Sequence, residues 1–177
     1  MIKRINRLIV LILPLAYHFG KRSNVLVLNA VILAGVLSIV YLKHHSDVKL
    51  KPKFLNEIFA PELKFLFLCG VCFLSILFFN KIVAMNVMLF VILGNTLADV
   101  AKERYGRVGE LVVFLYVGLS CSLFILFFPF VLDWRVALFG CFAGAIIRTI
   151  NLPVNTDISV GFVSGIVMSL LLIPAFI

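Results

Sequence analysis

A stretch of polar side chains interrupts a long apolar run near the middle of the chain. Its candidate functional residues are Gly94, Asn95, Asp99, Lys102, Arg104, Gly106 and Arg107. If a helix continues through this stretch, Asn95, Asp99 and Lys102 lie at positions i, i+4 and i+7 and share one face. An amide, a carboxylate and an ammonium group on one face could hold a polar ligand or a metal-bound phosphate. The same spacing is also typical of a helix end that is simply wetted by lipid headgroups.

A second polar group separates the last two apolar runs. It consists of Arg148, Asn155, Thr156, Asp157 and Ser159, and Pro153 favours an extended or turned backbone before the last run. Arg148 lies near the end of a run, where an arginine can snorkel to the membrane surface at small cost, so an interface role is one interpretation of it. Thr156-Asp157 before an apolar run is typical of a helix N-cap, and a helix N-terminus also favours phosphate oxygens. Capping and ligand binding can therefore coexist there.

The composition predicts the class of protein in which both polar groups lie. The chain is 63% hydrophobic and 14% charged, with a mean hydropathy of +1.19. Soluble domains are only about one half apolar. The apolar runs are continuous and do not alternate with polar residues, which argues against a transmembrane barrel. We therefore expect an all-helical integral membrane protein with a single transmembrane domain, residues 1–177.

Seven apolar segments predict the transmembrane helices. They are roughly residues 8–19, 24–42, 63–79, 82–98, 108–132, 136–150 and 158–177. Only Asn80 and Lys81 join the third segment to the fourth, so these two helices should form an antiparallel hairpin. The four cysteines lie inside apolar runs without an accompanying histidine, and we interpret them as packing residues.

The lysine and arginine distribution predicts the orientation. The side that the N-terminus would share with the even-numbered loops has twelve basic residues: Lys3, Arg4, Arg7, Lys43, Lys49, Lys51, Lys53, Lys64, Lys102, Arg104, Arg107 and Arg148. The other side has four: Lys21, Arg22, Lys81 and Arg135. The positive-inside rule then places the N-terminus and both polar groups in the cytoplasm, where nucleotides and metal ions are available. We expect the membrane to be the cell membrane of a prokaryote.

The two polar groups together resemble motifs of the membrane CTP-dependent lipid kinases, the family of dolichol kinase, phytol kinase and the CTP-using diacylglycerol kinases, related to phosphatidate cytidylyltransferase. That family carries Gly-Asp-x-x-Ala-x-x-x-Gly-(Lys/Arg)-x-x-Gly-(Lys/Arg) at a cytoplasmic helix end and Glu-x-x-x-x-Pro-x-Asp-Asp-Asn-(Leu/Phe)-Thr-(Val/Ile)-Pro before a final span. The resemblance covers roughly residues 55–177 and rests on the following positions: Glu62, Gly94, Ala98, Gly106, Arg107, Pro153, Asn155-Thr156-Asp157-Ile158-Ser159-Val160 and Val163-Ser164-Gly165.

The chain departs from these motifs at most of their carboxylates. Asn95 stands where the family has its first Asp, Lys102 where it has a Gly, and Arg148 where it has its Glu. The Asp-Asp-Asn run becomes Asn155-Thr156-Asp157. The family carboxylates are expected to hold a divalent metal and the nucleotide, because hard cations prefer anionic oxygen ligands. Asp99 and Asp157 are the carboxylates that remain for this role.

The resemblance implies transfer of the CTP γ-phosphate to a lipid alcohol of the polyprenol, phytol or diacylglycerol class, with Mg²⁺ or another divalent cation. Asp99 and Asp157 would be the catalytic and metal-binding residues. The nucleotide and phosphate groups would be bound by Gly94, Asn95, Lys102, Arg104, Gly106, Arg107, Arg148, Asn155, Thr156 and Ser159.

The alternative is a catalytically inactive family member that binds a lipid or a nucleotide, or serves as a partner subunit. Under either interpretation, we expect the partners to be a membrane lipid and a nucleotide. We expect no nucleic-acid polymer as a partner. Whether the chain forms a homo-oligomer is left open. A transporter is disfavoured, because the charges lie at span ends and not at the midplane where transporters bind substrate.

Overall fold

The computed structural model describes residues 6–45, 62–126, 133–150 and 155–172, and these residues are almost entirely helical, with no strand among them. The prediction of an all-helical chain is therefore confirmed. The predicted ends of the fifth and seventh helices, at residues 132 and 177, and the turn around Pro153 lie outside the described residues.

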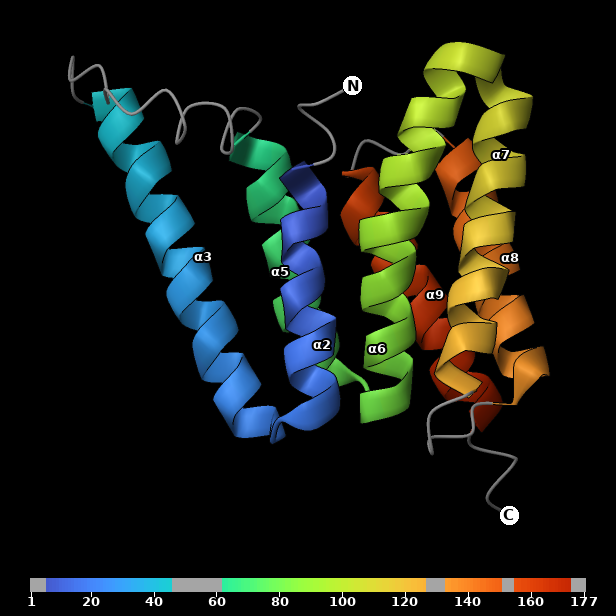
Figure 1. Cartoon of the computed structure of the whole chain (residues 1–177), viewed down its shortest axis with the longest axis horizontal. Coiled ribbons are helices and arrows are strands. Elements are labelled where there is room, and N and C mark those ends of the chain that lie inside the picture. Colours follow the sequence, from blue (N-terminus) through green and yellow to red (C-terminus); the bar gives the residue numbers. More distant parts are fainter. Residues whose placement is uncertain (1–5, 46–61, 127–132, 151–154, 173–177) are drawn as a thin grey trace.

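The helices run alternately up and down across the molecule (Figure 1). In chain order they are η1 (Asn6–Leu11, a 3-10 helix), α2 (Ile12–Phe19), α3 (Arg22–His45), α5 (Glu62–Phe78), α6 (Lys81–Leu89), η2 (Phe90–Asn95, a π-helix), α7 (Thr96–Leu126), α8 (Trp134–Thr149) and α9 (Thr156–Leu172). Their bounds follow the apolar segments of the sequence closely, except around the central polar stretch.

The polar stretch is itself helical, so the helix there is longer than the predicted fourth segment, residues 82–98. The helical backbone passes from α6 through η2 into α7 and changes direction at Gly106, whose φ of 66° and ψ of −160° are non-helical. This conformation is accessible almost only to glycine. The ribbon turns over there, and the rest of α7 descends beside its neighbours (Figure 1). The continuous helix before the corner is what the spacing of Asn95, Asp99 and Lys102 requires.

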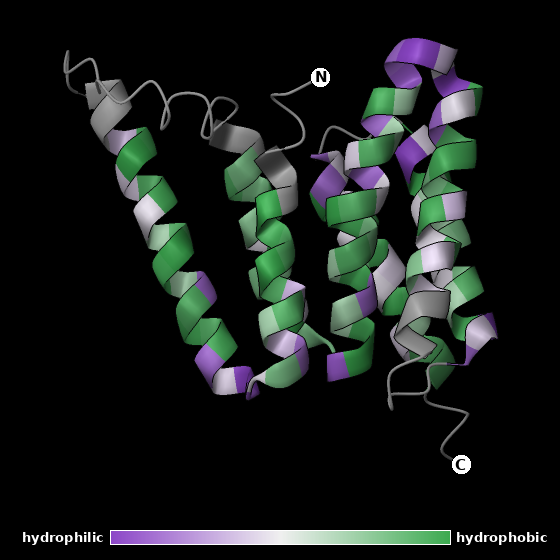
Figure 2. Ribbon diagram, viewed as in Figure 1, coloured by the Kyte–Doolittle hydropathy of each residue, from purple (hydrophilic) through white to green (hydrophobic). Residues whose placement is uncertain are grey.

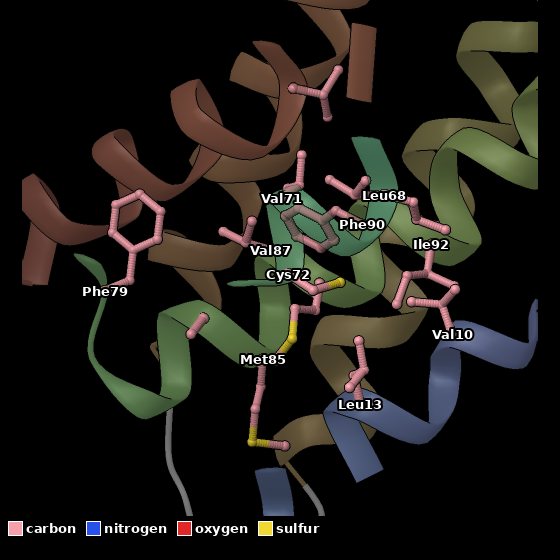
Figure 3. Close-up of a cluster of buried hydrophobic side chains, with 14 of the residues drawn as sticks. Val10, Leu13, Leu68, Val71, Cys72, Phe79, Met85, Val87, Phe90 and Ile92 are labelled. Atoms are coloured by element: carbon pink, nitrogen blue, oxygen red, sulfur yellow. The ribbon is translucent and has the colours of Figure 1, made fainter. Parts of the chain in front are cut away.

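The hydrophobic core extends over most of the helices, and part of it lies where α5, α6, η2 and α9 meet. Val71, Val87 and Phe90 are buried there, and Figure 3 shows them side by side. Gly161 of α9 packs against Val71 and Val87, and a Cβ at this position would lie only 2.6 Å from Val71 Cγ1. A small residue therefore permits the close helix approach. This packing brings the beginning of α9 toward the end of η2.

Polar residues gather at the ends of the helices and apolar residues in the middle (Figure 2). Among the described residues, two helical segments, Arg22–Tyr41 and Lys81–Ser122, are long and apolar enough to cross a membrane. Gly106 divides the second of them into two arms. Shorter apolar helices occupy residues 9–19, 65–78 and 156–172.

Candidate functional site

Arg148 lies at the centre of a group of buried polar side chains. It belongs to the last turn of α8, where the helix dipole favours a cation, and its side chain is only 3% exposed. Its Nη1 donates to Asn95 Oδ1 at 2.6 Å, and its Nη2 donates to Asp99 Oδ1 at 2.5 Å. One guanidinium therefore ties the end of α8 to the junction of η2 and α7.

Glu110 is the third partner of this guanidinium. Its Oε1 lies 2.8 Å from Arg148 Nε, in an ion pair without the alignment of a hydrogen bond, and its Oε2 lies 3.0 Å from Lys102 Nζ. The Glu110 side chain is 8% exposed, whereas that of Lys102 is 52% exposed. Burying a carboxylate is costly unless a cation accompanies it, and here two cations do so.

Sequence reasoning missed Glu110. Its only signal was that it is the sole carboxylate in the apolar run after Gly106, residues 108–126. It comes within reach of Lys102 because the chain turns at Gly106, which places the two arms of α7 beside each other.

Asp157 joins the group through Asn95. The Asn95 Nδ2 donates to Asp157 Oδ1 at 2.8 Å, while its own Oδ1 accepts from Arg148. Asp157 is 7% exposed and lies in the first turn of α9, where the helix dipole stabilises an anion. The two polar groups of the sequence thus meet in one place. We call these residues the polar cluster: Asn95, Asp99, Lys102, Glu110, Arg148 and Asp157.

The remaining residues of the second polar group lie at the beginning of α9. Asn155 Oδ1 accepts from the Asp157 backbone N–H at 2.9 Å, and the Ser159 hydroxyl donates to the Asn155 carbonyl at 3.2 Å. The capping residue is therefore Asn155, one position before the predicted Thr156-Asp157, and Thr156 is exposed. Asn155 and Ser159 shape the helix terminus that carries Asp157.

Gly94 lies inside the bundle and packs against an aromatic ring. A Cβ at Gly94 would lie 3.0 Å from Phe114 Cε2, and a Cβ at Gly144 would lie 3.2 Å from Phe114 Cζ. The Arg148 guanidinium stands 5.9 Å from the centroid of the same ring, within the range of a cation–π contact. The two glycines make room for the ring that supports Arg148.

The corner of α7 is exposed and basic. Lys102, Arg104 and Arg107 all face outward around Gly106, and we call these three residues the basic corner. The corner belongs to the hydrophilic region at the top of α7 in Figure 2. A small polar pocket of about 40 Å³ connects it with the polar cluster, and its lining consists of Lys102, Arg107, Glu110, Leu111, Arg148 and Thr149.

The donor set of the polar cluster does not fit a divalent cation. Asp99 is held by Arg148, and Asp157 accepts from Asn95, so the guanidinium lies among the oxygens that a metal would need. Within the described residues, no group of three or more His, Cys, Asp or Glu side chains is arranged to hold a metal ion. The positive charge in this place is supplied by the protein itself.

Comparisons of the chain with family models, with curated proteins and with solved structures find no match. They therefore do not test the resemblance of the two polar groups to the lipid kinase motifs.

Proposed function

We propose that this chain is an integral membrane protein with a bundle of about seven spans, built like the CTP-dependent lipid kinases, that binds a phosphate-bearing ligand without transferring the phosphate. The observation that carries the proposal is the pocket between the basic corner and the buried Arg148. Its lining offers the exposed cations of Lys102 and Arg107 to an anion, while Arg148 keeps the neighbouring carboxylates neutralised.

The outer surface of α3 supports the membrane part of this proposal. Val27, Val31, Leu37 and Tyr41 are large side chains with exposed fractions between 48% and 65%, and they follow one another along the helix. Monomeric soluble proteins rarely expose so continuous an apolar surface. Lipid tails would cover this surface without an unfavourable contact.

The basic corner supports the ligand class. Lysine and arginine bind phosphate oxygens through charge-assisted hydrogen bonds, and arginine does so through two parallel donors. The corner lies at the polar end of the helices, where the headgroup region of a bilayer would be (Figure 2). A phosphate mono- or diester fits this chemistry, whether it belongs to a lipid headgroup or to a nucleotide.

The state of the two motif carboxylates supports the absence of phosphoryl transfer. Catalysis of this type depends on charge neutralisation of the transferred phosphate by metal ions that bridge its oxygens. Asp99 and Asp157 are already engaged with Arg148 and Asn95. The chain would therefore keep the binding surface of a kinase while its carboxylates stabilise the fold.

A second candidate function is the lipid kinase activity itself. It is favoured by the convergence of Asn95 and Asp99 with Asp157, which lies 62 residues after Asn95 yet belongs to the same hydrogen-bonded group. Under this proposal, the acceptor would be a polyprenol, phytol or diacylglycerol hydroxyl, and CTP would be the donor.

We expect Arg107→Gln to weaken binding of the phosphate ligand about tenfold, the equivalent of about 1.4 kcal/mol, because one charge-assisted hydrogen bond is lost. Calorimetry of the detergent-purified protein with CTP and flotation with vesicles containing phosphatidic acid would distinguish the nucleotide from the lipid headgroup. The control is Arg135→Gln, which removes an exposed cation outside the basic corner. Binding of neither ligand by the wild type would refute the proposal.

The same purified protein tests whether the phosphate is only bound or is also transferred to a lipid. Incubation with Mg²⁺, labelled CTP and each of the three lipid alcohols should leave the lipids unlabelled. If the wild type forms labelled lipid phosphate and the Asp99→Asn variant does not, the protein is a lipid kinase instead.

We expect a cysteine placed at Tyr105 to be protected from an impermeant maleimide in intact cells, because the basic corner should face the cytoplasm. Tyr105 is 64% exposed, so protection would reflect the membrane and not burial. A cysteine at Phe19, the last residue of α2 and 83% exposed, should be labelled under the same conditions. The four native cysteines are buried and should give little background. Labelling of the cysteine at Tyr105 from outside would contradict the predicted orientation.

A further inference from the structure

We propose that the bundle has a second binding site, at the end opposite the basic corner, where an apolar groove with cations at its mouth holds one anionic phospholipid. The inference rests on the membrane part of the proposed function. It is independent of the ligand that the basic corner binds.

The apolar groove has a volume of about 500 Å³ and runs between α2, the helix formed by α6 and η2, and the second arm of α7. Among the described residues that line it, none is Lys, Arg, Asp or Glu. Leu15, Phe19 and Tyr116 belong to the lining and are themselves exposed. Cavities that hold a small organic ligand have about 300–1,000 Å³. A groove of this size and lining fits a hydrocarbon chain, which needs no hydrogen-bond partner.

The depth of the groove corresponds to one leaflet of a bilayer. Met85 and Leu93 both line it and are eight residues apart, which is about 12 Å along a helix. The hydrocarbon core of a bilayer is about 30 Å thick, so one leaflet contributes about 15 Å. Phe19 ends α2, and Lys81 begins α6 one turn before Met85. The groove therefore starts at the polar end of these helices and extends into the bundle, as a single acyl chain would.

Three cations lie around the open end of the groove. Lys81 Nζ donates to the carbonyl of His18, a lining residue, at 3.0 Å, and it stands 5.6 Å from the centroid of the Tyr17 ring. Lys21 and Arg22 follow His18 by three and four residues, and both are exposed. The lower ends of α3 and α6 are accordingly hydrophilic (Figure 2). We call Lys21, Arg22 and Lys81 the basic mouth.

The elements that carry the basic mouth contain no carboxylate side chain. Residues 6–45 and 63–98, which include α2, α3 and α6, have no Asp or Glu. The positive-inside rule disfavours Lys and Arg on the predicted non-cytoplasmic side, yet three of the four basic residues expected there belong to the basic mouth. Lysine and arginine form charge-assisted hydrogen bonds with phosphate oxygens. An anionic headgroup would balance this charge, and a phospholipid combines that headgroup with a hydrocarbon chain.

The test of the groove is titration of the detergent-purified protein with phosphatidylglycerol, followed by native mass spectrometry. We expect the wild type to bind one phosphatidylglycerol more tightly than phosphatidylcholine. Ser120 lines the groove, and Ser120→Phe should weaken binding about tenfold, the equivalent of displacing about two buried methylene groups. The matched control is Ser38→Phe outside the groove, which should bind like the wild type. Both serines are exposed, and each hydroxyl donates to the carbonyl four residues earlier, at 2.8 Å and 2.9 Å.

The basic mouth is tested by Lys21→Gln. This variant should bind phosphatidylglycerol about fivefold more weakly, which is the contribution of one basic residue near an anionic membrane surface. Arg135→Gln removes an exposed cation of the same predicted side and should have no effect. Glycerol phosphate, which lacks the hydrocarbon chain, should not displace the lipid. If Ser120→Phe does not fold, the comparison of Lys21→Gln with Arg135→Gln decides alone.

The proposal is overturned if Ser120→Phe binds phosphatidylglycerol as tightly as Ser38→Phe, or if Lys21→Gln binds it as tightly as Arg135→Gln. Equal binding of phosphatidylglycerol and phosphatidylcholine by the wild type would also overturn it. Displacement of the lipid by CTP would place the lipid at the basic corner instead of the groove. A wild type that binds CTP but no phosphatidylglycerol would refute the groove and leave the proposed function standing. Phosphatidylglycerol binding that responds to Ser120→Phe, without binding of CTP or phosphatidic acid, would do the reverse.

Discussion

Replacement of Arg148 by methionine should lower the free energy of unfolding by about 3–5 kcal/mol, because removing one partner of a buried ion pair leaves uncompensated charge behind. The methionine keeps much of the aliphatic volume against Phe114, so little of the loss would come from a cavity. Asp99 and Glu110 would each lose their contact with the guanidinium. Denaturation of the purified protein in mixed micelles, with EDTA present, measures the change.

Arg135→Met is the matched control. Arg135 is exposed, and its guanidinium lies 5.6 Å from the Trp134 ring, with no buried carboxylate partner among the residues that the structure describes. Surface substitutions of this kind usually change stability by less than about 0.5 kcal/mol. Similar losses in the two variants would mean that the polar cluster does not stabilise the fold.

A triple substitution separates the cost of leaving a buried charge unpaired from the net contribution of the polar cluster to stability. Buried ion pairs are often no more stabilising than apolar side chains of similar volume. Arg148→Met combined with Asp99→Leu and Glu110→Leu should therefore recover part of the stability that Arg148→Met alone loses. This recovery would indicate that the charges serve binding or specificity rather than net stability.

The helices could be predicted from the sequence because continuous apolar runs and turn residues determine their bounds. Asn80, for example, caps α6 by accepting from the Val83 backbone N–H, just where the third and fourth segments were separated. The structure of the polar stretch was harder to predict, because an apolar pattern cannot indicate whether a helix continues through charged residues. Its continuation depends on buried partners that belong to other helices.

The candidate site was predictable in part for the same reason. Helical spacing placed Asn95, Asp99 and Lys102 on one face, and the structure brings this face together with Asp157. The central position of Arg148 and the contribution of Glu110 were not predictable. Both depend on the Gly106 corner and on the packing of α8, which no local pattern encodes.

Whether the carboxylates of Asp99 and Asp157 can both lie near Arg148 depends on Asn95. The amide side chain of Asn95 is suited to that position. An amide donates on one side and accepts on the other, as Asp157 and Arg148 require. An aspartate there would only accept. The asparagine at position 95 therefore agrees with the arginine at position 148, and the two side chains form one arrangement.

Asn95→Asp should accordingly destabilise the protein by several kcal/mol, the usual cost of placing like charges against each other, about 2.8 Å from Asp157 Oδ1. The matched control is Asn155→Asp, because aspartate caps a helix about as well as asparagine and keeps the acceptor for the Asp157 backbone N–H. Thermal unfolding of both variants measures the difference. Equal stabilities would mean that the Asn95 amide is not required.

Exchange of the two side chains provides the decisive comparison. In the double variant Asn95→Asp/Asp157→Asn, the amide at position 157 can donate to the new carboxylate, which in turn can accept from Arg148. The pair keeps its single negative charge and its hydrogen bond, so most of the stability lost in Asn95→Asp should return. The recovery should be incomplete, since the carboxylate leaves the N-terminus of α9, where the helix dipole contributes about 0.3–1 kcal/mol. If the exchange recovers nothing, the cost of Asn95→Asp does not come from repulsion between these two residues, and the contact between η2 and α9 must be explained by packing alone.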